Sequence, residues 1–485
     1  MIKKKEINKL FNLSRTFLKK RPNINNLGNN FLFLQSVHLV HLSKYKYVNS
    51  NSADFLFFSR YIFEFSKNLV KIILFFFKII FSRNHTNINN NSKKKIIIVS
   101  HLNNIQRFKK NIDTQYFGIE KEFGKKKSIF FYLDHLNISK KQKSHFLNIK
   151  KNIFINNYYI EISTYKKIVL NIIKEFSFIY NHIKKSNNNF EKKFYLECAK
   201  YLFSLSTIKN IILYYNLEKL IIENKITNIL ITLEGHPYEY LIFLLGKKYK
   251  IKIFAYQISY ITKGHYSMFL NLGNNLMPSK ILANGKIAYD FLKKKFNPTN
   301  VVLLGSNKYR KKIKIKKIKN LNLLVIPSNF DGEASEFIEF CYRCLKKNKN
   351  LKTKLIFRLH PEINKFDFIK KNSNILKNEK RIKISDSILI EDISSCKFVL
   401  YRSSSAVIDA VQQGLIPIFF SEKRISFQSD PLWQLKSKIT VKNYYELSKV
   451  LDNKKQLNKR KYLEYINFAN NFYKPVNYSK IRKIL

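Results

Sequence analysis

Short apolar segments that alternate with amphipathic helical patterns run through most of this chain, and this alternation restricts its fold more than any other feature. It occupies residues 94–304 and starts again at Asn322, after a basic stretch. Consecutive strand–helix units build parallel sheets with right-handed crossovers. The sequence therefore predicts an α/β protein with two Rossmann-like domains that face each other across a cleft, where ligands are expected beside the strand ends.

Four regions follow from this pattern. We expect a basic, helical N-terminal extension over 1–92, a first Rossmann-like domain over 93–306, a linker over 307–320, and a second Rossmann-like domain with terminal helices over 321–485. A chain of 485 residues is long enough to give each domain its own core.

The elements themselves are placed by hydrophobic period. Strands of the first domain are expected at 94–101, 128–133, 227–232, 251–256, 280–283 and 301–304, with mostly helical sequence over 140–220 and helices at 238–250 and 286–295. Strands of the second domain are expected at 322–327, 354–358, 381–384, 398–401 and 416–420, with helices at 332–346, 388–395, 404–413 and within 446–472.

Composition narrows the class of protein. Hydrophobic residues make up 45% of the chain and aromatic residues 15%, which is typical of a folded protein. Four cysteines are too few for a disulfide framework and indicate a reducing compartment. Cys341 and Cys344 have the spacing of a metal or redox pair, but they lie within one expected helix, and we interpret them as packing residues.

The formal net charge of +58 points to an anionic partner such as nucleic acid or a membrane surface. The lysines, however, accompany abundant Asn, Ile, Phe and Tyr along the whole chain, as a codon bias would produce. No nucleic-acid-binding motif accompanies the charge, so nucleic acid is not an expected partner. Peripheral contact with an anionic membrane and binding of phosphate-bearing substrates both remain open.

The N-terminal region contains one strongly apolar segment. The chain opens with basic residues, but no apolar region with a cleavage site follows them, so no secretory signal is expected. The segment Leu69–Phe81 is interrupted by Lys71 and Lys78 and is shorter than the roughly 20 apolar residues of a membrane span. An interfacial helix with snorkelling lysines and an ordinary buried helix are both compatible with it.

Two polar clusters directly follow strands of the second domain, Arg358-Leu359-His360-Pro361-Glu362 and Arg402-Ser403-Ser404-Ser405. The serines open an expected helix, where hydroxyls and free backbone N–H groups can bind an anion such as a phosphate. Arg358 and Arg402 suit a phosphate by charge and fork geometry, although Arg358 could instead form an ion pair. A helix N-cap and a simple His-Pro turn are the structural alternatives.

A carboxylate follows a strand of the first domain, in Leu233-Glu234-Gly235-His236-Pro237. Glu234 could remove a proton from a substrate hydroxyl, or it could simply cap a helix. No Asp-x-Asp motif stands in a suitable loop, so metal-independent chemistry without a cofactor is expected.

Taken together, five motifs resemble those of bacterial surface carbohydrate biosynthesis proteins with the GT-B glycosyltransferase fold and, more distantly, those of the sialyl-, polysialyl- and Kdo-transferases that use CMP-sugars. The motifs are Ser100-His101-Leu102, Asp113-Thr114-Gln115-Tyr116-Phe117-Gly118, Leu233-Glu234-Gly235 with Tyr256-Gln257, the Arg358–Glu362 cluster and the Arg402–Ser405 cluster. They cover roughly residues 94–420. Two departures stand out: Leu233 replaces an acidic residue, and Ile258-Ser259 replaces a His-Gly pair.

The resemblance implies a cytoplasmic enzyme, at the inner face of the cytoplasmic membrane, that serves lipopolysaccharide or capsule synthesis. Its first domain would bind a glycan or lipid-linked acceptor, and its second a nucleotide-sugar donor such as a CMP-nonulosonate. It further implies Glu234 as the catalytic base. The leaving nucleotide would lie among His360 with its neighbours Pro361 and Glu362, and Ser403, Ser404 and Ser405.

Two other functions remain open from the sequence. A CDP-glycerol-type glycerophosphotransferase would also have two domains, and His236 or His101 could supply its second catalytic histidine. A non-catalytic basic protein that binds RNA or lipid is the other alternative.

Overall fold

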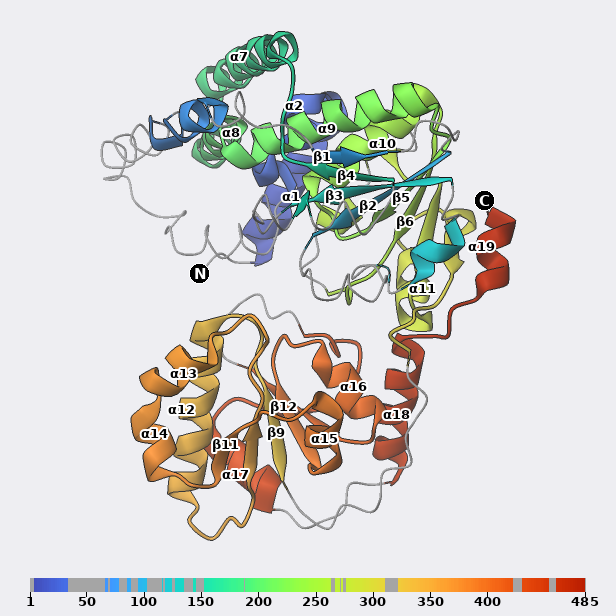
Figure 1. Ribbon diagram of the computed structural model, residues 1–485. Helices are drawn as coiled ribbons and strands as arrows, with labels where there is room; N and C mark the ends of the chain where they lie inside the picture. Colours follow the sequence, from blue (N-terminus) through green and yellow to red (C-terminus); the bar gives the residue numbers. More distant parts are fainter. Residues whose placement is uncertain are drawn as a thin grey trace.

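The structure is a computed structural model. It describes residues 4–33, 66–68, 70–77, 85–88, 95–102, 116, 118–123, 127–134, 143–144, 152–186, 188–262, 267–270, 272–273, 276–309, 322–421, 430–452 and 459–484. Within these residues the chain forms two α/β units, one above the other in Figure 1.

The first domain is built on an eight-stranded sheet with the order β1-β4-β3-β2-β5-β6-β7-β8. Its strands are β1 (His85–Asn87), β2 (Ile96–His101), β3 (Ser128–Leu133), β4 (Ile153–Asn156), β5 (Asn228–Thr232), β6 (Lys252–Tyr256), β7 (Lys280–Ala283) and β8 (Val301–Leu303). Only β1 is antiparallel to its neighbour. The chain reverses direction across the sheet between β2 and β5, and this switch point is where Rossmann-like sheets bind ligands.

Helices cover this sheet and extend beyond it. They are α1 (Lys4–Lys20), α2 (Ile24–Gly28), α7 (Ile162–Lys185), α8 (Asn189–Leu202), α9 (Leu205–Asn224), α10 (Pro237–Tyr249) and α11 (Lys286–Lys293), with short 3₁₀ turns η1 (Asn30–Phe33), η2 (Ile119–Phe123), η3 (Ser267–Phe269) and η5 (Pro298–Asn300). The N-terminal helices are part of the domain core, because Leu18, Leu27 and Phe31 are fully buried in it.

The second domain has a six-stranded sheet with the order β11-β10-β9-β12-β13-β14. Its strands are β9 (Leu323–Ile326), β10 (Leu355–Phe357), β11 (Ile382–Ile384), β12 (Phe398–Tyr401), β13 (Ile416–Phe420) and β14 (Ile439–Val441). Its helices are α12 (Asp331–Lys347), α13 (Lys365–Lys371), α14 (Ser373–Asn378), α15 (Leu389–Ser394), α16 (Ala406–Gln412), α17 (Tyr444–Asp452) and α18 (Lys459–Phe472). Every pair of strands is parallel, and the switch point lies between β9 and β12. Cys341 and Cys344 are buried in this core, as expected.

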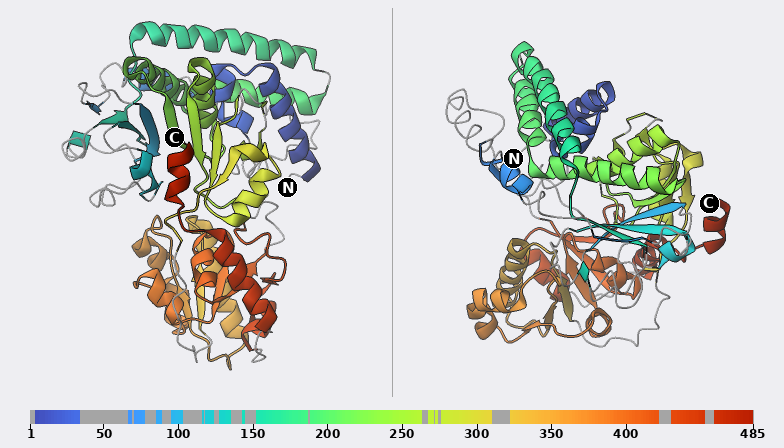
Figure 2. Two further views of the ribbon diagram at one scale, coloured as in Figure 1. Left: turned by 90° about the vertical axis from the view of Figure 1, so that its right-hand side faces the viewer. Right: turned by 45° about the horizontal axis from the view of Figure 1, so that its top comes forward.

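The last segment of the chain returns to the first domain, as Figure 2 also shows. Helix α19 (Tyr478–Ile484) packs Ile481 into a core cluster of the first domain, so this helix departs from the predicted second domain of 321–485. The backbone of 472–475 lies so close to Gly285 and Gly305 that a Cβ at either glycine would overlap it. Because Gly305 also has φ +93°, only glycine suits that position.

The expected fold class is confirmed: two Rossmann-like sheets of parallel strands with a helical N-terminal region. Three strands, β1, β4 and β14, were not predicted from the sequence. Strand β4 lies in a region that was expected to be helical. The predicted helix over 404–413 begins later, at Ala406. Most of the predicted linker, 310–320, and motif residues 113–115 lie outside the described residues. None of the described helices is both long and apolar enough to cross a bilayer.

Candidate active site

The loop after β5 is shaped by one buried carboxylate and one glycine. Glu239, in the first turn of α10, accepts hydrogen bonds from the backbone N–H groups of Glu234, Gly235 and His236 at 2.8–3.2 Å. Gly235 has φ +82°, and a Cβ there would lie 2.4 Å from the backbone nitrogen of Met268. The loop is therefore held in one conformation that fixes the direction of the Glu234 side chain.

Glu239 itself is completely buried. Burial raises its pKa to about 7, with the negative charge of Glu234 acting in the same direction. The positive charge of His236 and the backbone N–H groups of Gly235 and Glu234 act in the opposite direction. Glu239 is not among the site residues predicted from the sequence, although its position three residues after His236 has the spacing of a capping box.

Glu234 and His236 form a carboxylate–imidazole pair at the switch point. Oε2 of Glu234 lies 3.5 Å from Nε2 of His236, and Ser259 donates a hydrogen bond to Oε1. Burial alone would raise the pKa of Glu234, but the hydrogen bond and charge of His236, with help from Ser259 and His101, lower it to about 2. Burial would lower the pKa of His236, but Glu234 and Glu239 outweigh burial and raise it. The two groups consequently titrate as a pair.

A second histidine completes this cluster. His101, at the end of β2, shares a 2.8 Å hydrogen bond between its Nε2 and the hydroxyl of Tyr238. The His101 and His236 rings lie 6.5 Å apart, and Tyr238 stacks on His236. The structure thus brings together Glu234, His236 and His101 from two strand ends that are distant in sequence.

The loop after β6 joins this cluster from the other side. Gln257 is buried, and its side-chain amide donates to the carbonyl oxygen of Ser259 while its oxygen accepts from the backbone N–H of Asn284. These bonds fold the loop so that the Ser259 hydroxyl reaches Glu234. Ser259 is therefore a direct hydrogen-bond partner of the candidate base.

One hydrogen bond links this cluster to the second domain. Tyr260, next to Ser259, donates from its hydroxyl to the carbonyl oxygen of Ser403 at 2.7 Å. The Ser403 hydroxyl donates to Oε2 of Glu333, whose Oε1 accepts from the backbone N–H of Ser328 after β9. The switch points of the two sheets are therefore connected by a continuous series of contacts.

The other serines differ from Ser403. Ser404 is half-buried and Ser405 is exposed, and neither hydroxyl makes a hydrogen bond to the described residues. Ser405 occupies the N-cap position of α16 without a side-chain capping bond. Their hydroxyls can therefore turn toward a ligand.

Both candidate arginines are bound to carboxylates of their own domain. Arg402 is buried and makes two 2.8 Å hydrogen bonds to Glu336 of α12. Arg358 contacts Asp392 at 2.7 Å, which is the ion pair considered from the sequence. In this arrangement the arginines fix the loops after β10 and β12.

His360 lies on the turn after β10. Its Nδ1 accepts from the backbone N–H of Glu362 at 3.3 Å, and Pro361 stands between them. Burial lowers the pKa of His360, and the charge of Glu362 offsets this only in part. A neutral imidazole can still donate one N–H to a phosphate or base.

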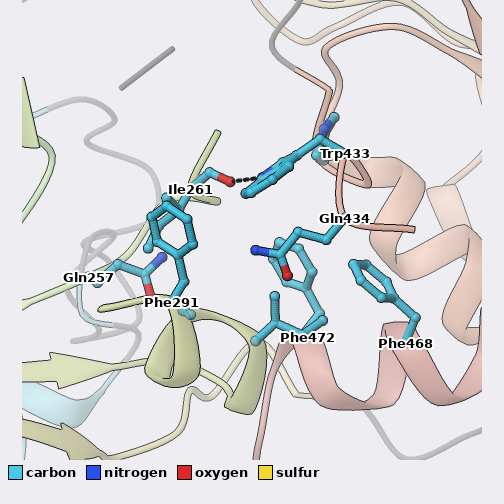
Figure 3. Close-up of a pocket in the computed structure, with 10 residues that line it drawn as sticks. Gln257, Ile261, Phe291, Trp433, Gln434, Phe468 and Phe472 are labelled. Carbon is cyan, nitrogen blue, oxygen red and sulfur yellow. Dashed lines mark hydrogen bonds between the residues drawn. The ribbon is translucent and has the colours of Figure 1, made fainter. Parts of the chain in front are cut away.

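The interdomain joint contains a small pocket beside Gln257 (Figure 3). Trp433 of the second domain donates from its indole N–H to the carbonyl oxygen of Ile261, and Phe291 packs edge-on against it. The space inside is about 10 Å³, which holds one water at most. This pocket is a packing contact between domains and is too small for a nucleotide. Among the described residues, no group of three or more His, Cys, Asp or Glu side chains is arranged to hold a metal ion.

No family model matches this sequence, and no curated protein matches it. Solved structures with a similar layout include the UDP-GlcNAc 2-epimerase of Methanocaldococcus jannaschii in complex with UDP-GlcNAc and UDP, at 13% identity and a TM-score of 0.44 over 80% of this chain and 99% of that one. Acinetobacter baumannii MurG is 10% identical with a TM-score of 0.45, over 80% and 98% of the two chains. The lipopolysaccharide outer core galactosyltransferase WaaB is 11% identical with a TM-score of 0.42, over 80% and 98%. With sequence identities this low and TM-scores below 0.5, these similarities do not indicate a function for this chain.

Proposed function

We propose that the protein is a glycosyltransferase that moves a sugar from a nucleotide-sugar donor to a cell-surface glycan or its lipid-linked precursor. The observation that supports this most is the hydrogen bond from Tyr260 to Ser403. It joins the loop that contacts Glu234 through Ser259 to the loop of the second sheet that carries Ser403, and so supports a reaction site between the two domains.

The proposed reaction divides between the two domains. The acceptor hydroxyl loses its proton to the Glu234–His236 pair and its oxygen attacks the anomeric carbon of the donor. The bond from that carbon to the phosphate oxygen breaks, and the nucleotide leaves with the electron pair. The pair takes the proton when His236 is neutral, and the proton then stays on the His236 imidazole, whose protonated form the Glu234 carboxylate stabilises.

The second domain would stabilise the departing nucleotide. The hydroxyls of Ser404 and Ser405 and one N–H of His360 are the donors that we assign to the phosphate and base, with Pro361 and Glu362 shaping the turn. Arg358 and Arg402 contribute by holding the two loops. We propose a CMP-nonulosonate as donor and a metal-independent transfer, so EDTA should leave the rate unchanged.

A glycerophosphotransferase is the second candidate, and one observation favours it. The ring centroids of His101 and His236 lie 6.5 Å apart, and phosphate transfer by two histidines would need such proximity. An assay that follows sugar and glycerophosphate transfer in parallel separates the two, with His101→Gln and His236→Gln measured in each.

The test begins with a thermal-shift panel of CMP, CDP, UDP, GDP and ADP against the wild-type protein and its Ser404→Ala and His360→Ala variants. A bound nucleotide raises the melting temperature by mass action. We expect a shift with CMP that both variants reduce. A preference for UDP or GDP would replace the proposed donor but keep the transferase. If no nucleotide raises the melting temperature and the Glu234→Gln variant differs from the wild type in no assay, a non-catalytic binding protein would be favoured.

A further inference from the structure

Half of the large apolar side chains that are exposed in the described part of the chain lie on two neighbouring helices of the first domain. One helix spans residues 70–77, and the other is α7. The exposed side chains are Val70, Ile73, Leu74 and Phe77 on the first helix and Ile162, Leu170, Ile173 and Tyr180 on α7. Each is between 44% and 64% exposed. Together with the exposed lysines of these two helices, named below, they form a surface that we call the apolar–basic face.

Their spacing places them on defined helical stripes. Positions 70, 73, 74 and 77 have the spacing i, i+3, i+4 and i+7 and so share one face of the helix. On α7, Ile162, Ile173 and Tyr180 are separated by nearly whole numbers of turns. Another face of α7 is already buried in the core through Ile168, Ile172, Ile179 and Ile183. Helix α7 is therefore apolar on two sides, and only one side is covered.

Exposed lysines lie between these apolar residues. They are Lys71 on the first helix and Lys166, Lys167, Lys174, Lys184 and Lys185 on α7. The acidic residue within α7, Glu175, is buried and bound by Arg21. Burial and the nearby charges of Lys185, Lys20 and Arg21 lower the pKa of His182, as a positive local potential does.

The two helices touch, and their location leaves them accessible. The ring of Phe76 packs on Tyr165 of α7, and Phe75 packs on Tyr158 just before α7. Figures 1 and 2 show α7 on the side of the first domain that points away from the second domain. A flat partner could cover this face without closing the interdomain site.

We propose that the apolar–basic face is a docking surface for an anionic membrane. The aliphatic and aromatic side chains would enter the boundary between headgroups and acyl chains, while the lysines pair with lipid phosphates. Each lysine near such a surface contributes about 1 kcal/mol. A second copy of the chain would bring like charges together, and single-stranded RNA would need stacking aromatics rather than exposed Ile, Leu and Val. This inference does not depend on the proposed transferase activity.

The test is flotation of the full chain with vesicles of phosphatidylcholine alone or mixed with phosphatidylglycerol. We expect flotation with the anionic vesicles that weakens as salt is added, because salt screens the lysines. Replacing Leu74, Phe77, Leu170 and Ile173 by Ser should lower partitioning about tenfold or more, since apolar burial supplies the anchoring. The variant Lys166→Gln/Lys167→Gln/Lys174→Gln should lose the preference for anionic vesicles.

The matched control changes equally exposed apolar residues of the second domain, Phe366, Ile388, Tyr445 and Leu463, to Ser. It should float like the wild type, and thermal melts should show that all variants are folded. Equal flotation of the control and the first-domain serine variant would overturn the proposal. The proposal would also be overturned if the wild type did not float and instead formed a dimer that the serine variant dissociates. It would be overturned as well if the wild type did not float and instead bound RNA in a way that only the lysine variant loses.

Discussion

The two switch points have the same position in two similar sheets but opposite chemistry. In the first domain, ionisable groups face one another: Glu234 lies 3.5 Å from His236, and His101 lies nearby. In the second domain, the charged side chains are bound to partners of their own domain, as Arg402 is to Glu336, while the Ser404 and Ser405 hydroxyls make no bond to the described residues. In the proposed transferase, this difference would divide the reaction between the two Rossmann units, with proton transfer in the first and neutral donors to a phosphate in the second.

The largest effect is expected for Glu234→Gln. Removal of a positioned base costs roughly 10²–10⁴-fold in rate, and the substitution also removes the charge that raises the pKa of His236. Single-turnover transfer should fall accordingly, while the thermal shift caused by the donor nucleotide should persist because the second domain is untouched. Glu223→Gln, on an exposed glutamate of α9, is the matched control. Full activity of the Glu234→Gln variant would show that Glu234 is not the catalytic base.

Arg402→Gln should act on stability rather than on nucleotide binding. It leaves Glu336 unpaired and deletes two hydrogen bonds of a buried guanidinium, which costs about 3 kcal/mol. Chemical denaturation of Arg402→Gln, Glu336→Gln and the double variant would measure the coupling between the two residues. A stable Arg402→Gln protein with strongly weakened nucleotide binding would instead make Arg402 a ligand.

Ser404→Ala should weaken nucleotide binding modestly. A neutral hydrogen bond contributes about 1 kcal/mol, so the dissociation constant should rise about five- to tenfold with no loss of folding stability. Ser403→Ala differs, because its hydroxyl already donates to Glu333 and its loss should lower the melting temperature. Isothermal titration and thermal melts of the two variants test this contrast, which fails if both behave alike.

The smallest effect separates the two histidines by pH. The pKa of His236 is raised in the folded state, so its stabilising contribution is present below the unfolded value of about 6.5 and is lost as pH rises through the folded value. The pKa of His360 is lowered, so stability should instead increase as pH rises toward 6.5. Melting curves from pH 5 to pH 8 for His236→Gln and His360→Gln should therefore differ from the wild type with opposite slopes. Parallel slopes would show that the two environments are alike.

Most elements could be predicted because strand and helix periods are local properties of the sequence. Strand β4 could not, since Ile153–Asn156 lies in a lysine- and asparagine-rich region and is defined by pairing with β3. The residue types at the strand ends, such as Glu234 and Ser404, followed from position in a strand–helix unit. Their partners did not: Arg402 and Glu336 are 66 residues apart, and their pairing depends on β9 lying beside β12. Two carboxylates in the first turns of α12, Glu333 and Glu336, were the available signal.

The return of α19 to the first domain has a consequence for folding during synthesis. Ile481 is fully buried among first-domain residues, and Asn477 donates its backbone N–H to the carbonyl oxygen of Leu304. The ribosome delivers the first domain early, but this part of its core is filled by residues made after the whole second domain. The first domain therefore acquires its last packing contacts only when the second has emerged, and the order of translation makes the two domains mature together.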